Sequence, residues 1–204
     1  MTNEGGPAAR SNRLQLVLVL VVFLGPVLLA GLLYVNADRW LGTGPTGQHG
    51  ELYQPARPLD GLPVTGADGG AMSLDDLRGK WTLVVIGSGQ CGSDCRDALY
   101  KVRQAHKAQG KNIGRVQRLF VALDGRFGPH TRDFLAAEHP HLKLGIPDGG
   151  KQALAQFRHP EAAGLRGIYL VDPNVNLVMR YGWDVDAEGI LKDLEHLLKH
   201  SAIG

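Results

Sequence analysis

Hydrophobic residues form one long uninterrupted run near the N-terminus and a series of short runs in the rest of the chain. Residues 14–35 carry no charge, which is the length and character of a helix that crosses a bilayer. Arg10 and Arg13 precede the run, whereas Asp38 offsets Arg39 after it. The positive-inside rule therefore places the N-terminus in the cytoplasm and the rest of the chain outside. The alternative is a cleaved signal peptide, but the run is longer than a usual h-region and no clear cleavage site follows it directly.

The short runs after the N-terminal third predict strands that alternate with helices. Residues 82–86 are mostly β-branched and lack polar alternation, as in a strand buried on both faces. The patterns predict further strands over 118–123, 143–146, 167–171 and 177–181, and helices from the cysteine turn to about 110 and over 131–138, 152–157 and 187–200. This order predicts an α/β domain with a central sheet flanked by helices. Its last two strands should form an antiparallel hairpin.

These elements divide the chain into four expected parts. Residues 42–50 are rich in glycine, as in a flexible tether, and the following residues to 70 indicate an irregular lead-in with a short edge hairpin. The predicted boundaries are a cytoplasmic tail over 1–13, a transmembrane anchor over 14–37, a linker over 38–58 and the α/β domain over 59–204.

Composition excludes two classes of protein. The 204 residues carry a formal charge of +2 without a basic stripe, which argues against nucleic-acid binding. Two cysteines cannot build a disulfide scaffold, so the domain must be stabilised by packing. The glycine-rich segments also lack the Lys-Ser/Thr of a phosphate-binding loop, so nucleotide binding is unsupported.

The two cysteines, Cys91 and Cys95, lie where the buried strand passes through a glycine-rich turn into a helix. If the helix begins near Cys91, both sulfurs lie on one face, one turn apart. The positive end of the helix dipole stabilises thiolates, which attack disulfides and bind metals. Such a pair can close a disulfide or hold a soft ion such as Cu(I). The alternative is that both cysteines are simply buried apolar residues.

The chain resembles the Sco (SenC) family of cytochrome c oxidase assembly proteins, within the thioredoxin superfamily. The matching pieces span about residues 59–198 and are Leu77-Arg-Gly-Lys80, Cys91-Gly-Ser-Asp-Cys95, Phe120-Val-Ala-Leu-Asp124 and Ile168-Tyr-Leu-Val-Asp-Pro173. The resemblance implies a thioredoxin-like fold, copper held by Cys91 and Cys95, and a single-pass protein of a bacterial-type inner membrane with its C-terminal domain in the periplasm. The implied partner is a cytochrome c oxidase subunit or another assembly factor.

The chain departs from the family pattern at three places. Gly92 and Arg96 follow the cysteines where family members usually carry proline. Gly164 stands where the family has its third copper ligand, a histidine. His159, five residues upstream, is the candidate replacement, although a histidine before a proline in a loop is usually solvated. A thioredoxin-like cis-proline is also absent, with Leu165-Arg-Gly167 in that region, which weakens a disulfide-exchange role.

Three functions therefore stay open. The first is a copper-binding assembly factor that delivers Cu(I) through Cys91 and Cys95. The second is an enzyme, a thiol–disulfide reductase that keeps the copper-ligand cysteines of the oxidase reduced. The third is a non-catalytic assembly partner that retains the fold. Because Gly164 replaces the family's third copper ligand, it favours the second and third functions over the first.

Other polar groups are interpreted as ordinary surface residues. His139 and His141 flank Pro140, which restricts any joint metal site, and we expect them in a loop. His196 and His200 are one turn apart near the end of the last helix, where histidine complements the helix dipole. Asp124 matches an acidic position near the Sco site but is also a common residue after a strand.

Overall fold

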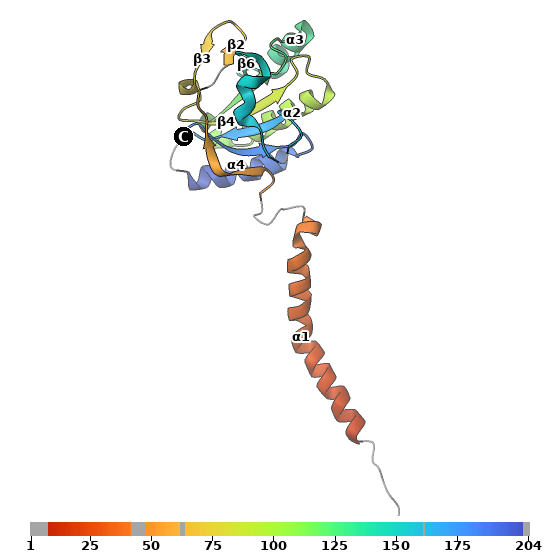
Figure 1. Cartoon of the computed structure of the whole chain (residues 1–204). Coiled ribbons are helices and arrows are strands. Elements are labelled where there is room, and N and C mark those ends of the chain that lie inside the picture. Colours follow the sequence, from red (N-terminus) through yellow and green to blue (C-terminus); the bar gives the residue numbers. More distant parts are fainter. Residues whose placement is uncertain (1–7, 42–47, 62–63, 161, 202–204) are drawn as a thin grey trace, which may run out of the picture. The chain divides into compact units, whose positions relative to one another are not determined.

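The computed structural model describes residues 8–41, 48–61, 64–160 and 162–201. It contains two compact units, residues 1–47 and 48–204. The first unit is the helix α1 (Ala8–Leu41), which includes Pro26 (Figure 1). The large apolar side chains described between residues 18 and 33 are all exposed. Among the described residues, no helix meets both the length and the hydropathy expected of a membrane span. Most of the expected tail and tether, residues 1–7 and 42–47, lies outside the described residues.

The second unit is built on one mixed sheet of eight strands in the order β1-β8-β7-β4-β5-β6-β2-β3 (Figure 1). The strands are β1 (Glu51–Pro58), β2 (Val64–Gly66), β3 (Ala71–Met72), β4 (Trp81–Gly87), β5 (Val116–Ala122), β6 (Lys143–Pro147), β7 (Gly167–Val171) and β8 (Asn176–Tyr181). The central strands β4, β5 and β6 are parallel, and the other neighbours are antiparallel. The predicted α/β sheet and its closing antiparallel hairpin, β7–β8, are therefore confirmed.

The α-helices of this unit are α2 (Ser93–Lys107), α3 (Pro129–Glu138) and α4 (Ala187–His200), and the short 3₁₀ helices are η1 (Leu74–Asp76), η2 (Gly110–Arg115) and η3 (Gly150–Phe157). The segment expected as a helix over 152–157 is thus a 3₁₀ helix, with Gly149 and Gly150 before it at positive φ. The other predicted helices agree with the structure to within two residues at each end, except that α2 ends before residue 110.

The sheet carries a hydrophobic core on each face. Along β4, Leu83 and Val85 point into the core that α2 and α4 cover, whereas Val84 and Ile86 point into the core that contains η3. All seven residues of β4 are buried, which confirms the strand predicted to be buried on both faces. The cysteine turn follows directly from this central strand, so the most buried part of the domain positions it.

The strand β1 was not predicted, because its eight residues fall inside the expected linker over 38–58. It forms one edge of the sheet by pairing with β8. It contains Pro55 and Pro58, and only one of its residues is buried, so its sequence lacks the alternation of a half-buried strand. Proline is tolerated at such an edge because one side of the strand makes no ladder hydrogen bonds.

Candidate functional site

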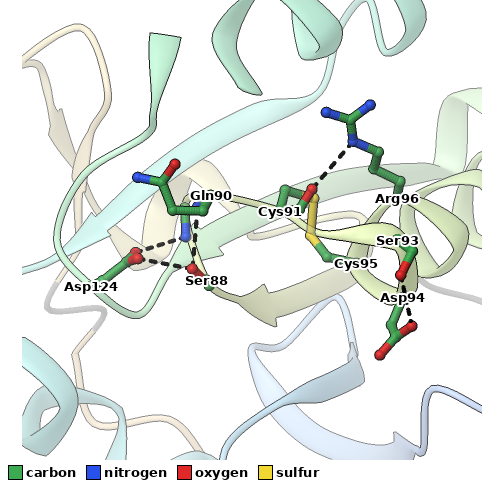
Figure 2. The surroundings of a disulfide bond; sticks show 9 residues. Ser88, Gln90, Cys91, Ser93, Asp94, Cys95, Arg96 and Asp124 are labelled. Carbon is green, nitrogen blue, oxygen red and sulfur yellow. Dashed lines mark hydrogen bonds between the residues drawn. A yellow bond between two sulfur atoms is a disulfide. The ribbon is translucent and has the colours of Figure 1, made fainter. Parts of the chain in front are cut away.

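The cysteine turn connects the end of β4 to the start of α2, and a disulfide joins Cys91 to Cys95 with 5.0 Å between their Cα atoms (Figure 2). The helix begins at Ser93 with Gly92 as its N-cap, two residues after Cys91. Cys95 lies in the first turn of α2, whereas Cys91 precedes the helix with φ of +40°. The two residues expose only 1% and 2% of their surface. The pair is therefore close, oxidised and buried.

Asp124, which follows β5, fastens the other end of this turn. Its carboxylate accepts a hydrogen bond from the Ser88 hydroxyl at 2.9 Å and one from the Gly89 N–H at 2.7 Å (Figure 2). The Cys91 N–H donates to the Ser88 carbonyl at 3.0 Å, which closes the turn on itself. The Asp124 carboxylate thus positions the cysteine turn by direct hydrogen bonds.

Arg96 fixes the turn from the helix side. Its Nε donates to the Cys91 carbonyl at 3.2 Å (Figure 2). Its guanidinium lies 4.7 Å from the centre of the Phe134 ring. A guanidinium and a helix N-terminus beside a cysteine both favour thiolate over thiol once the disulfide is reduced. Arg96, which stands where the Sco pattern usually has proline, therefore ties the first turn of α2 to the backbone of Cys91.

The loop before β7 reaches the same end of the sheet as the cysteine turn, because Gly167 pairs with Ile86 in antiparallel register. Gly164 belongs to this loop, and an added Cβ there would meet no atom within 4 Å.

Trp183 borders the turn as well, since a Cβ on Gly87 would lie 3.3 Å from its ring. Arg166 stacks on the Trp183 ring at 4.4 Å. A cavity of about 460 Å³ lies here, lined by Trp183 and by Ser93, Asp94, Asp97 and Asp184.

His159, the candidate third ligand, contacts the edge strand β1. Its Nδ1 lies 3.4 Å from Glu51 Oε2, its Nε2 lies 3.4 Å from the Leu52 carbonyl oxygen, and its ring meets the Tyr53 ring edge-on at 4.8 Å. Tyr53 belongs to the core on the face opposite the cysteines. Within the described ranges, no three His, Cys, Asp or Glu residues gather closely enough to hold a metal ion. The structure brings Cys91 and Cys95 together but does not bring His159 to them.

The remaining histidines divide into two kinds. His196 and His200 have ring centres 4.5 Å apart, and His200 Nδ1 lies 2.8 Å from the His196 carbonyl, on the exposed side of α4. His139 lies directly after α3, in the loop where it was expected, but its side chain is buried. Burial, followed by the charges of Arg103 and Arg118, lowers the pKa of His139 to about 4. No local sequence pattern indicates this burial, because it depends on packing between distant elements.

Comparison with known families identifies the domain. Residues 81–201 match the profile described as transmembrane-like, thioredoxin-like, C-terminal domain, which is more than half of the chain. The chain belongs to this transmembrane-like, thioredoxin-like family. The match begins at the first residue of β4 and ends just after α4, so it includes the cysteine turn and both helices that cover it.

This thioredoxin-like chain is also similar to Sco proteins, as its sequence motifs indicate. It is 27% identical over 152 residues to the mitochondrial protein SCO1 homolog 1 of Arabidopsis thaliana, an alignment that covers 65% of this chain and 46% of that protein. The chain thus aligns with about half the length of this curated relative.

Two solved structures share the fold. The crystal structure of Arabidopsis thaliana ScoI with copper bound superposes with a TM-score of 0.58 at 22% identity, covering 69% of this chain and 98% of that one. BsSco, described as a Sco-family cytochrome c oxidase assembly protein with a disulfide switch, superposes with a TM-score of 0.54 at 16% identity, covering 72% and 96%. The predicted thioredoxin-like fold and the resemblance to Sco proteins are therefore confirmed.

Proposed function

We propose that this chain is a membrane-anchored, outward-facing assembly factor that carries Cu(I) on Cys91 and Cys95 and delivers it to a haem–copper oxidase subunit. The observation that carries the proposal is the position of the two sulfurs, which the structure brings together at the start of α2 on a Sco-like fold. The copper-bound Arabidopsis ScoI structure and the oxidase-assembly role stated for BsSco support the choice of cargo and partner.

The oxidised pair must be reduced before it can bind copper, because the thiolate is the metal ligand. A dithiol protein supplies the two electrons by thiol–disulfide exchange and leaves with its own disulfide closed. The two thiols that form then release their protons as they bind Cu(I), a soft ion that suits sulfur. Two thiolates are the donor set that the described residues offer, since no group of three candidate ligands exists among them.

Access to the sulfurs requires that the cysteine turn opens. Both cysteines are almost fully buried, so neither a reducing partner nor a copper acceptor reaches them in the oxidised structure. The side chains that hold the turn shut include Asp124 on one side and Arg96, through its hydrogen bond to the Cys91 carbonyl, on the other. We infer that reduction loosens this turn and that the partner docks over it.

Copper titration tests the proposal. The purified full chain, reduced and kept anaerobic, should take up one Cu(I) in competition with a chromophoric Cu(I) chelator, and the disulfide form should take up none. Cys91→Ser and Cys95→Ser should each lose this uptake, because one thiolate remains. Ser93→Ala, which removes a hydroxyl from the same turn, is the matched control and should bind as the wild type does. Uptake by the disulfide form, or by either cysteine variant, would disprove the assigned ligands.

The same protein tests the role of His159. We expect His159→Ala to bind Cu(I) like the wild type, because the His159 ring contacts Glu51 and Tyr53. We also expect no stable thiolate-to-copper absorption band with Cu(II), which thiolates alone hold poorly and tend to reduce. A strong band in the wild type that disappears in His159→Ala would show that His159 is a copper ligand.

The membrane anchor is part of the proposal. The uncharged residues 14–35 lie within α1, and the apolar side chains described between residues 18 and 33 are exposed, as expected of a helix solvated by lipid. A reporter that is active only outside the cytoplasm, fused after Gly204, should therefore be active. The paired substitution Arg10→Glu and Arg13→Glu should lower that activity, because it removes the positive flank. Activity from a reporter that works only in the cytoplasm would contradict this topology.

A second candidate function is thiol–disulfide exchange with the copper-ligand cysteines of the oxidase. The observation in its favour is the closed Cys91–Cys95 disulfide. In this case the reduced protein should reduce a disulfide-bonded peptide carrying the acceptor's cysteine pair, while it takes up no Cu(I). The two functions are separated by measuring both activities on the same preparation.

A further inference from the structure

Three basic side chains from different elements lie together on the α2 side of the sheet. Arg103 comes from α2, Arg118 from β5, and His139 directly follows α3. Arg118 lies on the same face of β5 as Val116 and Phe120, which belong to the core under α2. We call these three residues the basic cluster. It is separate from the cysteine turn, since Arg118 lies in the first half of β5 and pairs with Leu83 near the start of β4.

Two backbone carbonyls hold the basic cluster together. Arg103 Nη1 donates to the Glu138 carbonyl, and Arg118 Nη2 donates to the Pro140 carbonyl at 3.0 Å. His139 lies between Glu138 and Pro140 in sequence, and its ring meets the Phe134 ring edge-on. The two guanidiniums therefore donate to carbonyls only two residues apart, on either side of His139 in sequence.

Four nitrogen atoms of the basic cluster are buried without a hydrogen-bond partner in the part of the chain that the structure describes. They are Arg103 Nε, Arg118 Nε, Arg118 Nη1 and His139 Nδ1. Arg118 and His139 expose only 6% and 3% of their surface. A buried guanidinium ordinarily uses its donors on carboxylates or carbonyls, because a buried polar group without a partner destabilises the fold. Three of these four nitrogens are N–H donors of the two guanidiniums, which indicates that a further hydrogen-bond acceptor binds beside Arg103 and Arg118.

The charges at the basic cluster are also unbalanced. Among the described residues, Glu138 is the one carboxylate whose charge raises the pKa of His139. Its side chain is more than half exposed and pairs with Arg103 at 3.1 Å. Burial, followed by Arg103, lowers the pKa of Arg118. His106, in the last turn of α2, has its pKa lowered by burial and then by the charge of Arg118. Among the described ion pairs, Glu138 pairs with Arg103 and no carboxylate pairs with the buried Arg118, so an additional negative charge would stabilise the basic cluster.

We propose that the basic cluster binds one small oxyanion, of the phosphate or sulfate type, through the unpartnered donors of Arg103 and Arg118 with His139 beside them. Guanidinium groups match oxyanions in both charge and hydrogen-bond geometry. The oxyanion enters from the side of Arg103, because the Arg103 side chain contacts solvent and the exposed Glu138 carboxylate. The bound oxyanion completes the link between α2, β5 and the end of α3.

Thermal unfolding of the oxidised full chain tests the site. At matched ionic strength, phosphate or sulfate at tenfold its dissociation constant should raise the unfolding midpoint by about 3–6 °C over chloride, and the rise should saturate. Arg118→Met keeps the length of the side chain without its charge and should lose the rise. Arg78→Gln, at an exposed arginine paired with Asp75, is the matched control and should keep it. A rise that survives in Arg118→Met, or an equal rise over chloride in acetate, would overturn the proposal.

Titration of His139 in the wild type provides a test that needs no destabilised variant. An anion bound between the two guanidiniums offsets their charge, so phosphate should raise the pKa of His139 from about 4 by about 1–3 pH units. The ring proton signal, assigned with His139→Gln, reports this change by NMR. A His139 titration that is identical in phosphate and in chloride would show that the basic cluster serves only to hold the end of α3.

Discussion

Gly89→Ala is expected to lower the free energy of unfolding by about 3 kcal/mol or more, because the cysteine turn leaves no room for a side chain. A Cβ on Gly89 would lie 1.7 Å from the Arg126 carbonyl oxygen and 2.9 Å from Asp124 Oδ1. The first of these is backbone, which does not move aside as a flexible side chain does. Accommodation therefore requires the whole turn to shift, together with its hydrogen bonds to Asp124 and Gly128.

Denaturant unfolding of the oxidised full chain in detergent, followed by near-UV circular dichroism, measures this effect. Gly114→Ala is the matched control, because an added Cβ in η2 meets no atom within 4 Å. That variant should stay within about 0.5 kcal/mol of the wild type. Equal stability of the two variants would show that the turn around Gly89 is already mobile, which contradicts its role as the fixed support of Cys91.

The parts of the fold that the sequence predicted are those with strong local signals. The β-branched run over 82–86 is the central strand, and the amphipathic pattern over 187–200 is α4 to the residue. The proximity of Cys91 and Cys95 followed from their spacing alone. In each case the property depends on a few neighbouring residues, so it can be inferred without knowledge of the rest of the fold.

The parts that could not be predicted depend on contacts between distant residues. The edge strand β1 exists because β8 pairs with it, and its own residues carry prolines instead of an alternating pattern. His159 contacts Glu51 and Tyr53, more than 100 positions away, which no local pattern indicates. The burial of Arg118 and His139 likewise follows from how α2 and α3 pack on β5. Sequence identified the chemistry of the cysteines, whereas the groups that support or surround them required the structure.

The residues that lead into β1 are held by a buried carboxylate on α4. Asp193 accepts hydrogen bonds from the His49 N–H at 3.0 Å and the Gly50 N–H at 3.1 Å, and its Oδ1 lies 3.2 Å from His49 Nδ1. The His49 side chain also packs against α4, because a Cβ on Gly189 would lie 2.9 Å from it. The chain thus enters the thioredoxin-like domain through a fixed contact with its last helix, and this contact sets the start of the edge strand.

Asp193→Ala is therefore expected to lower the free energy of unfolding by about 2–4 kcal/mol, because it leaves two backbone N–H groups without their charged acceptor. Asp193→Asn retains one acceptor oxygen and should give a smaller loss. Glu195→Ala, at an exposed acid on the same helix, is the matched control and should change stability by less than about 0.5 kcal/mol. Denaturant unfolding gives the free energies, and amide hydrogen exchange locates the change, which should be largest in β1 and its partner β8. If Asp193→Ala matches Glu195→Ala in both measurements, the contact with His49 and Gly50 does not fix the entry of the chain into the domain.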